Sequence, residues 1–134
     1  MARPSVAGVV THGHYAGDVA EPLDELLPGR HGLMVRLLAK AGQRPALLDC
    51  LHRYADELVD AEPLTEALVM CLDPQEQDAV WLFEWFNGPN GQDEHRASAP
   101  FALLIAELQD IRAAEPQVLP LEPLRMHLNV GENL

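Results

Sequence analysis

The most informative part of the chain is Val80–Phe101, which reads VWLFEWFNGPNGQDEHRASAPF. It begins as an apolar run with one charged residue, Glu84, passes through a turn-forming cluster at 87–91 and then becomes helical in composition. A glutamate inside a buried strand is costly unless a cation or hydrogen-bond donors satisfy it. His95 follows the turn, so an ionisable ring is expected where the end of a strand meets the start of helices, a common location for a binding site.

Hydrophobic periodicity predicts an alternation of strands and helices around this stretch. The expected elements are strands at Leu33–Lys40, Glu66–Leu72, Ala79–Phe86 and Leu124–Val130, a helix from Pro45 to the break at Glu62-Pro63, a short helix at Gln92–Arg96, and a longer helix that Ser98 caps and that has Pro100 in its first turn. The order strand, helix, two strands, helices, strand is the ferredoxin-like pattern of an α+β protein. We therefore predict a four-stranded antiparallel sheet with helices on one face and with its first and third strands adjacent.

The face of this sheet that the helices leave open is predicted to be aromatic. Trp81, Phe83 and Trp85 alternate along the third strand and so share one face. A second copy of the sheet is the simplest cover for such a surface, which predicts a homodimeric α+β barrel.

The chain is predicted to divide into an N-terminal extension at 1–31 and a ferredoxin-like domain at 32–134. In the extension, Val6–Tyr15 is a candidate strand and Pro22–Leu27 a candidate helical turn, and the segment is either a flexible arm or an ordered strap. His12 and His14 suggest a metal by composition only, because no carboxylate or thiolate lies at a spacing typical of a shared metal site. No metal site is predicted.

Composition excludes several classes of partner. The net charge of −12 disfavours nucleic acid and anionic membranes, both of which need clustered cations. No apolar run approaches the roughly 18 residues of a membrane-spanning helix, and no secretory signal is visible. Cys50 and Cys71 are interpreted as small buried hydrophobic residues in a reducing compartment, so the expected location is the cytoplasm.

Three residues of this chain are candidates for proton or charge chemistry. With the first and third strands adjacent, Arg36 and Glu84 are expected to face each other, either as an ion pair that fixes register or as a site in which Arg36 binds a substrate oxyanion. His95 can exchange a proton near neutral pH, or it can be a helix-end histidine satisfied by backbone carbonyls.

Other polar residues are candidate substrate contacts. Tyr54 lies on the inward stripe of the first helix and either orients a polar ring substituent or packs in the core; His52 lies on the same helix. Asn87, at the end of the third strand, either polarises a carbonyl or makes the turn. The sequence shows no motif of a phosphate-binding loop, no spacing typical of a catalytic nucleophile with its base, and no cofactor-binding motif. No cofactor is therefore predicted.

The spacing of Glu84, Phe86, His95, Ser98 and Phe101 resembles the signature of the antibiotic biosynthesis monooxygenase family. In that family a strand reading Glu-x-aromatic is followed by His-x-x-Ser-x-x-Phe, and here the aromatic residue is Phe86 while the tryptophan, Trp85, lies on the opposite face of the strand. The resemblance covers Gly32–Asp110 and implies a dimeric barrel in which His95 faces a ligand cavity. It does not extend to the haem-degrading relatives, since Ile105 stands at the position of their axial histidine.

The resemblance implies a cofactor-independent monooxygenase that oxidises a polycyclic phenol, anthrone or quinol with dioxygen in secondary metabolism. His95 would accept or return the proton and Arg36 would stabilise the phenolate. The residues expected to contact the substrate are Glu84, Phe86, Tyr54, Asn87, Phe101, His52 and Trp85. The alternatives are a cyclase, isomerase or decarboxylase acting on a related compound, and a dimeric binding protein without catalytic activity.

Overall fold

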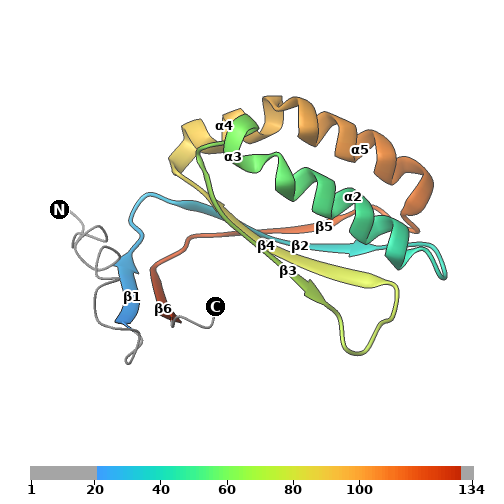
Figure 1. Ribbon diagram of the computed structural model, residues 1–134, viewed down its shortest axis with the longest axis horizontal. Coiled ribbons are helices and arrows are strands. Elements are labelled where there is room, and N and C mark those ends of the chain that lie inside the picture. The colour runs from blue at the N-terminus through green and yellow to red at the C-terminus, as the bar shows by residue number, and fades with distance from the viewer. Residues whose placement is uncertain (1–20, 131–134) are drawn as a thin grey trace. The chain divides into compact units, whose positions relative to one another are not determined.

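The computed structural model describes residues 21–130 of the chain (Figure 1). The chain divides into two compact units, of which the larger is Arg30–Glu122. The smaller joins Met1–Gly29 to Pro123–Leu134 and is described here over 21–29 and 123–130. The expected strand at Val6–Tyr15 and the histidines at 12 and 14 lie outside the described residues.

The larger unit is an antiparallel sheet with helices on one face (Figure 1). Its strands are β2 (His31–Leu38), β3 (Thr65–Leu72), β4 (Ala79–Phe86) and β5 (Gln117–Leu121), in the order β3-β4-β2-β5. Its helices are α2 (Arg44–Asp56), α3 (Leu58–Ala61), α4 (Gly88–Ala97) and α5 (Ala99–Ile111). This is the predicted ferredoxin-like α+β fold, with the first and third strands of the unit adjacent. None of the helices within residues 21–130 is long and apolar enough to span a bilayer.

Local sequence explains where α4 and α5 begin. The predicted cap of α5 is confirmed, because the Ser98 hydroxyl accepts a hydrogen bond of 3.1 Å from the backbone N–H of Phe101. The expected turn at 87–91 is wrong: Asn87 is the N-cap of α4, and the helix continues without a break to Ala97. Gly88 has a φ of 74°, a conformation that glycine adopts without strain, so the chain turns directly from β4 into the helix.

The register of β2 against β4 decides which side chains share a face. Leu33, not Arg36, lies opposite Glu84, and Arg36 lies opposite Trp81 with its guanidinium carbon 5.8 Å from the ring centroid. The expected pairing of Arg36 with Glu84 is therefore wrong. The displacement is three residues, and because side chains alternate along a strand, an odd displacement moves Arg36 to the opposite face of the sheet.

The fourth strand of the sheet is not the one expected from sequence. β5 occupies the edge beside β2, where Pro120 is tolerated because an edge strand leaves one side without a partner strand. The expected final strand does form, as β6 (Arg125–Val130), but it pairs with β1 (Glu21–Leu26) in a separate two-stranded sheet. The helical turn expected at Pro22–Leu27 is therefore wrong as well.

Charged side chains link the two strands of this smaller sheet. Asp24 accepts hydrogen bonds from Arg125 Nε at 2.8 Å and from His127 Nδ1 at 3.0 Å. These bonds hold the pKa of Asp24 well below its usual range. In the larger unit, Cys50 is buried as expected, whereas Cys71 is exposed on the open face of the sheet opposite Trp81, and both are free thiols.

Gly91 of α4 packs closely against Phe86 of β4 and against Leu64, the residue before β3. A Cβ at this position would lie 2.9 Å from the carbonyl oxygen of Leu64 and 3.0 Å from Cβ of Phe86. We expect Gly91→Ala to lower the free energy of unfolding by about 1–3 kcal/mol, because backbone must shift to admit the methyl group. Urea denaturation measures the change. Asn90→Ala, at an exposed neighbouring position in α4, is the control and should be neutral or stabilising; equal stability of the two variants would contradict the close approach.

Candidate functional site

A fully buried carboxylate, Glu62, joins four elements of the larger unit. It lies between α3 and β3 with 0% of its surface exposed. It accepts hydrogen bonds from Tyr54 Oη at 2.8 and 2.9 Å, from Ser98 Oγ at 2.6 Å and from Thr65 Oγ1 at 2.8 Å. His95 Nδ1 lies 2.9 Å from the same carboxylate. The donors come from α2, β3, the end of α4 and the junction with α5, so Glu62 fixes these segments relative to one another.

The hydrogen bonds determine the charge of Glu62. Burial acts to raise its pKa, but the bonds from His95, Ser98, Thr65 and Tyr54 outweigh burial and leave the pKa below the ordinary value of 4.5. Burial, together with the bond to Glu62, also raises the pKa of Tyr54 far above that of a free phenol, so Tyr54 remains a neutral donor.

An ionised carboxylate only accepts hydrogen bonds, which fixes the orientation of the His95 ring. Nδ1 must carry a proton to approach Glu62, so the ring exposes Nε2 on its other side. The ring is held between Phe86 and Phe101, at centroid distances of 4.9 and 4.1 Å. With 5% of its surface exposed, His95 has one defined orientation, and its Nε2 lies 3.9 Å from Glu84 Oε1.

Beside His95 is an internal cavity of about 160 Å³ between the sheet and the helices. Its polar lining consists of Tyr54, Glu84 and His95. The remaining lining is apolar: Leu33, Val35, Leu37, Leu82, Phe101, Leu104, Ile105, Leu108, Pro116 and Val118. Two of these residues, Ile105 and Val118, are 39% and 49% exposed, so the cavity approaches the surface between α5 and β5.

Glu84 differs from Glu62 although it is nearly as buried, with 4% of its surface exposed. Within residues 21–130, no side chain or backbone donor is recorded within hydrogen-bonding distance of its carboxyl group. Burial is the main cause and raises its pKa; electrostatic attraction to His95 opposes this rise, repulsion from the Glu62 carboxylate adds to it, and the net effect is a pKa above 4.5. The cavity therefore contains a carboxyl group that is protonated more readily than an ordinary glutamate.

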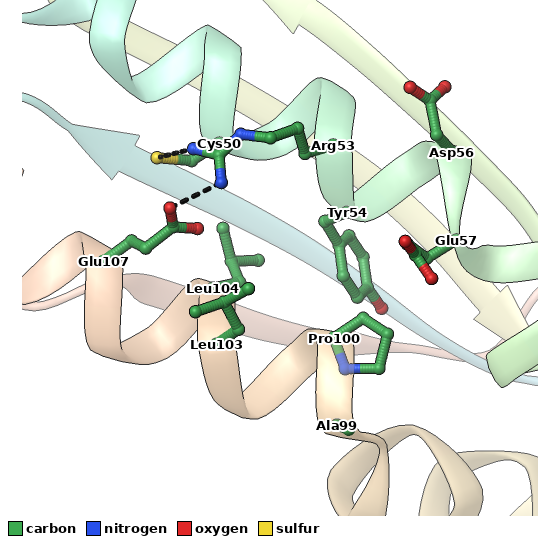
Figure 2. A pocket seen from close by; sticks show the side chains of 10 residues that line it. All are labelled: Cys50, Arg53, Tyr54, Asp56, Glu57, Ala99, Pro100, Leu103, Leu104 and Glu107. Carbon is green, nitrogen blue, oxygen red and sulfur yellow. Dashed lines mark hydrogen bonds and ion pairs between the residues drawn. The ribbon is translucent and has the colours of Figure 1, made fainter.

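A second hollow, a groove of about 430 Å³, lies between α2 and α5 (Figure 2). Figure 2 shows Arg53 of α2 reaching across to Glu107 of α5, at 2.6 Å, with Cys50 Sγ 3.3 Å from the same guanidinium group. Tyr54 and Leu104 line both the groove and the internal cavity. Because Arg53 and Glu107 satisfy each other, whereas Glu84 and Nε2 of His95 face open space, we take the internal cavity as the candidate site.

The structure brings together five of the residues predicted from sequence. Glu84, His95, Tyr54 and Phe101 line the cavity, and Phe86 packs on the ring of His95.

Four predicted site residues lie elsewhere. Arg36 and Trp85 are on the opposite face of the sheet, because they alternate with cavity-lining residues. His52 is exposed on α2, and Asn87 is exposed and donates a hydrogen bond of 3.1 Å to Glu66.

Sequence reasoning missed Glu62 and Thr65. Glu62 precedes Pro63 and was interpreted only as the end of a helix, a position that carries no signal of burial. Ser98 was recognised as a cap, but its donation to Glu62 was not predicted. Among residues 21–130, no three histidine, cysteine, aspartate or glutamate side chains are arranged to hold a metal ion.

We expect the two buried glutamates to affect stability in opposite directions. The pKa of Glu62 is lowered, so its stabilisation is present above pH 4.5 and is lost as the pH falls through the folded-state value. The pKa of Glu84 is raised, so the folded state holds more protons and stability falls as the pH rises above 4.5.

Glu62→Gln should therefore cost about 2 kcal/mol at neutral pH and much less in acid, whereas Glu84→Gln should stabilise the protein at neutral pH only. Thermal melting across this pH range checks both, and the same sign for the two variants at neutral pH would contradict the assignment.

Comparison with known proteins agrees with this architecture. No protein-family model and no curated protein matches the sequence. Solved structures do match it. A protein from Chloroflexus aurantiacus J-10-fl, provisionally named an antibiotic biosynthesis monooxygenase, has 26% identity and a TM-score of 0.57, over 67% of this chain and 90% of its own. A similarly named protein from Caulobacter crescentus CB15 has 14% identity and a TM-score of 0.66, over 72% and 91%.

A protein of unknown function from Nitrosomonas europaea, NE2512, has 26% identity and a TM-score of 0.59, over 77% of this chain and 92% of its own. Several structures that carry the monooxygenase name therefore share the order of elements described above over most of their length. The chain has the fold of the antibiotic biosynthesis monooxygenase family.

Proposed function

We propose that the protein is a cofactor-independent monooxygenase that oxidises a small phenol or quinol with dioxygen. The observation that carries the proposal is the bond between Glu62 and His95 Nδ1, which directs Nε2 of a buried imidazole into an apolar cavity. The fold and the names of several structural neighbours support oxygenation as the reaction.

The Glu62–His95 pair has the properties of a general base. The carboxylate keeps Nδ1 protonated, so Nε2 has its lone pair available for a proton of the substrate. When Nε2 accepts that proton, the imidazolium lies 2.9 Å from a negative charge that cannot leave the site. This stabilisation lowers the cost of removing a proton from a phenol inside an apolar cavity.

Cavity size selects among the expected substrates. At about 160 Å³ it is close to the roughly 150 Å³ engineered cavity that binds benzene, and well below the 300 Å³ or more of pockets for drug-sized ligands. A single ring matches this volume more closely than a three-ring anthrone does. We therefore favour a monocyclic phenol or quinol over the polycyclic substrates expected from sequence, with Phe101 and Tyr54 shaping the slot.

The reaction balances without a cofactor. A hydroquinone, C₆H₆O₂, and dioxygen give a hydroxyquinone, C₆H₄O₃, and water. His95 takes a phenolic proton, the phenolate passes one electron to dioxygen, and the ring radical and superoxide join through a new carbon–oxygen bond. The oxygen–oxygen bond then breaks, the hydrogen on that carbon leaves as a proton, and water departs with the proton that His95 returns. The substrate supplies all the electrons.

Oxygen uptake with a panel of monocyclic phenols and hydroquinones, in metal-chelating buffer, tests the proposal. We expect His95→Gln to reduce turnover about 100-fold or more and Glu62→Gln to reduce it as well, because the imidazolium loses its counter-charge. His52→Gln is the matched control, since His52 is exposed on α2 outside the cavity. Failure of every substrate would contradict the proposal, and turnover that persists without oxygen would indicate a cyclase or isomerase instead.

We also propose that two copies pair through the open face of the sheet, as the sequence predicted. Val69, Leu119 and Leu121 are 48%, 57% and 41% exposed there. By strand register they share that face with Phe83 and Met34. An exposed apolar face of this kind is typical of an interface between subunits.

Sedimentation velocity checks the pairing. The protein should sediment as a dimer, and Val69→Glu should shift it to a monomer because a charge would be buried at the interface. Val59→Glu is the control, since Val59 is 83% exposed on α3, on the helical side of the sheet. A wild-type monomer, or a dimer that tolerates Val69→Glu, would contradict the pairing.

For the cellular setting we propose the cytoplasm and a role in secondary metabolism, where aromatic polyketides supply phenolic rings. Two free thiols fit a reducing compartment. Recovery of the protein from the culture medium or the envelope fraction would contradict this location.

A further inference from the structure

We propose that the cavity binds a neutral ring compound through one hydroxyl group placed between His95 and Glu84, and that Glu84, as a carboxylic acid, donates a hydrogen bond to that oxygen. The inference rests on the proposed function in its use of His95 as the base. It adds a catalytic role for Glu84, as a donor to the oxyanion that forms when the hydroxyl proton moves to Nε2.

The distance between the two groups fits a bridging atom. Nε2 of His95 and Oε1 of Glu84 are 3.9 Å apart, too far for a direct hydrogen bond. An oxygen about 2.8 Å from each would form an angle of about 90° between them, which the lone pairs and proton of a hydroxyl can satisfy. The hydroxyl then donates to Nε2 and accepts from Glu84.

The burial of Glu84 indicates that a ligand completes its hydrogen bonding. The side chain is 4% exposed and faces the cavity, and the nearest polar atom given for it within residues 21–130 is Nε2 of His95 at 3.9 Å, beyond hydrogen-bonding distance. Buried polar groups nearly always have a partner. Because most of the lining near Glu84 is apolar, a hydroxyl group of a ligand in the cavity can supply this partner.

Charge determines the class of ligand. Glu62 already places one negative charge beside His95, and none of the described residues that line the cavity is an arginine or a lysine. An ionised Glu84 would repel a phenolate, whereas a neutral Glu84 donates to it. A carboxylate or phosphate ligand would meet no cation in this cavity, so the preferred ligand is an uncharged phenol or enol.

Binding of 4-fluorophenol in the absence of oxygen, followed by ¹⁹F NMR on the full-length chain, tests the inference. Glu84→Gln keeps a neutral donor and should bind within threefold of the wild type. Glu84→Leu removes the donor at similar volume and should bind tenfold or more weakly. The ¹⁹F shift should indicate a more ionised ring in the wild type than in Glu84→Leu.

Two ligand controls separate the hydroxyl contribution from ring burial. Fluorobenzene should bind wild type and Glu84→Leu equally, and 4-fluorobenzoate should not bind the wild type. Equal affinity of Glu84→Leu and wild type for 4-fluorophenol, equal losses in the glutamine and leucine variants, or no binding to the wild type would each overturn the inference.

The binding test does not depend on turnover. If 4-fluorophenol binds as expected but no phenol or quinol consumes oxygen, the oxygenase proposal fails and the bridging hydroxyl stands. If oxygen uptake requires His95 but is unchanged in Glu84→Leu, the role of Glu84 fails alone. Melting temperatures of both Glu84 variants show whether each is folded.

Discussion

The ionised, fully buried Glu62 is the constraint on which the geometry of the site depends. A carboxylate without access to water must obtain its solvation from the protein, and here four side chains supply it. Each donor is thereby fixed as well: Tyr54 keeps its proton, and His95 turns Nδ1 toward Glu62. The direction in which Nε2 points follows from the charge of a residue that does not itself line the cavity.

Two glutamates on either side of one imidazole show that burial alone does not set a charge state. Glu62 and Glu84 are both almost completely removed from solvent. Glu62 receives hydrogen bonds from four side chains and its pKa is lowered, whereas within residues 21–130 no such donor reaches Glu84, and its pKa is raised. The site therefore combines a fixed negative charge with a neutral acid, and this contrast arises from the placement of hydroxyl groups.

Sequence predicted the parts of the structure that depend on local pattern. The bounds of β4, the Ser98 cap and the convergence of Glu84, His95 and Phe101 follow from apolar runs, capping chemistry and motif spacing. Arg36 was misplaced because strand register depends on contacts between distant segments.

The local sequence pattern also failed to predict the burial of Glu62 and the position of β5 in the sheet. Glu62 precedes a proline at the end of a helix, and nothing in that context signals burial. The last strand of the sheet was predicted at Leu124–Val130, and no strand was predicted at 117–121, where β5 forms with Pro120 in an edge strand.

The attachment of α5 has a consequence for how molecules reach the cavity. Ser98 ties the start of α5 to Glu62. At the other end, the backbone N–H of Lys40 donates to the carbonyl of Ile111 and the N–H of Ala113 donates to the carbonyl of Leu38, both at 2.8 Å, which ties the end of α5 to the end of β2. A helix that is hydrogen-bonded at both ends cannot rotate away from the sheet as a rigid body to open the cavity. Ligands must instead enter and leave past the side chains of Ile105 and Val118. The other route opens when β5, a five-residue strand hydrogen-bonded to one neighbouring strand, separates from the sheet. Exchange rates at the cavity would then be governed by the weakest edge of the sheet.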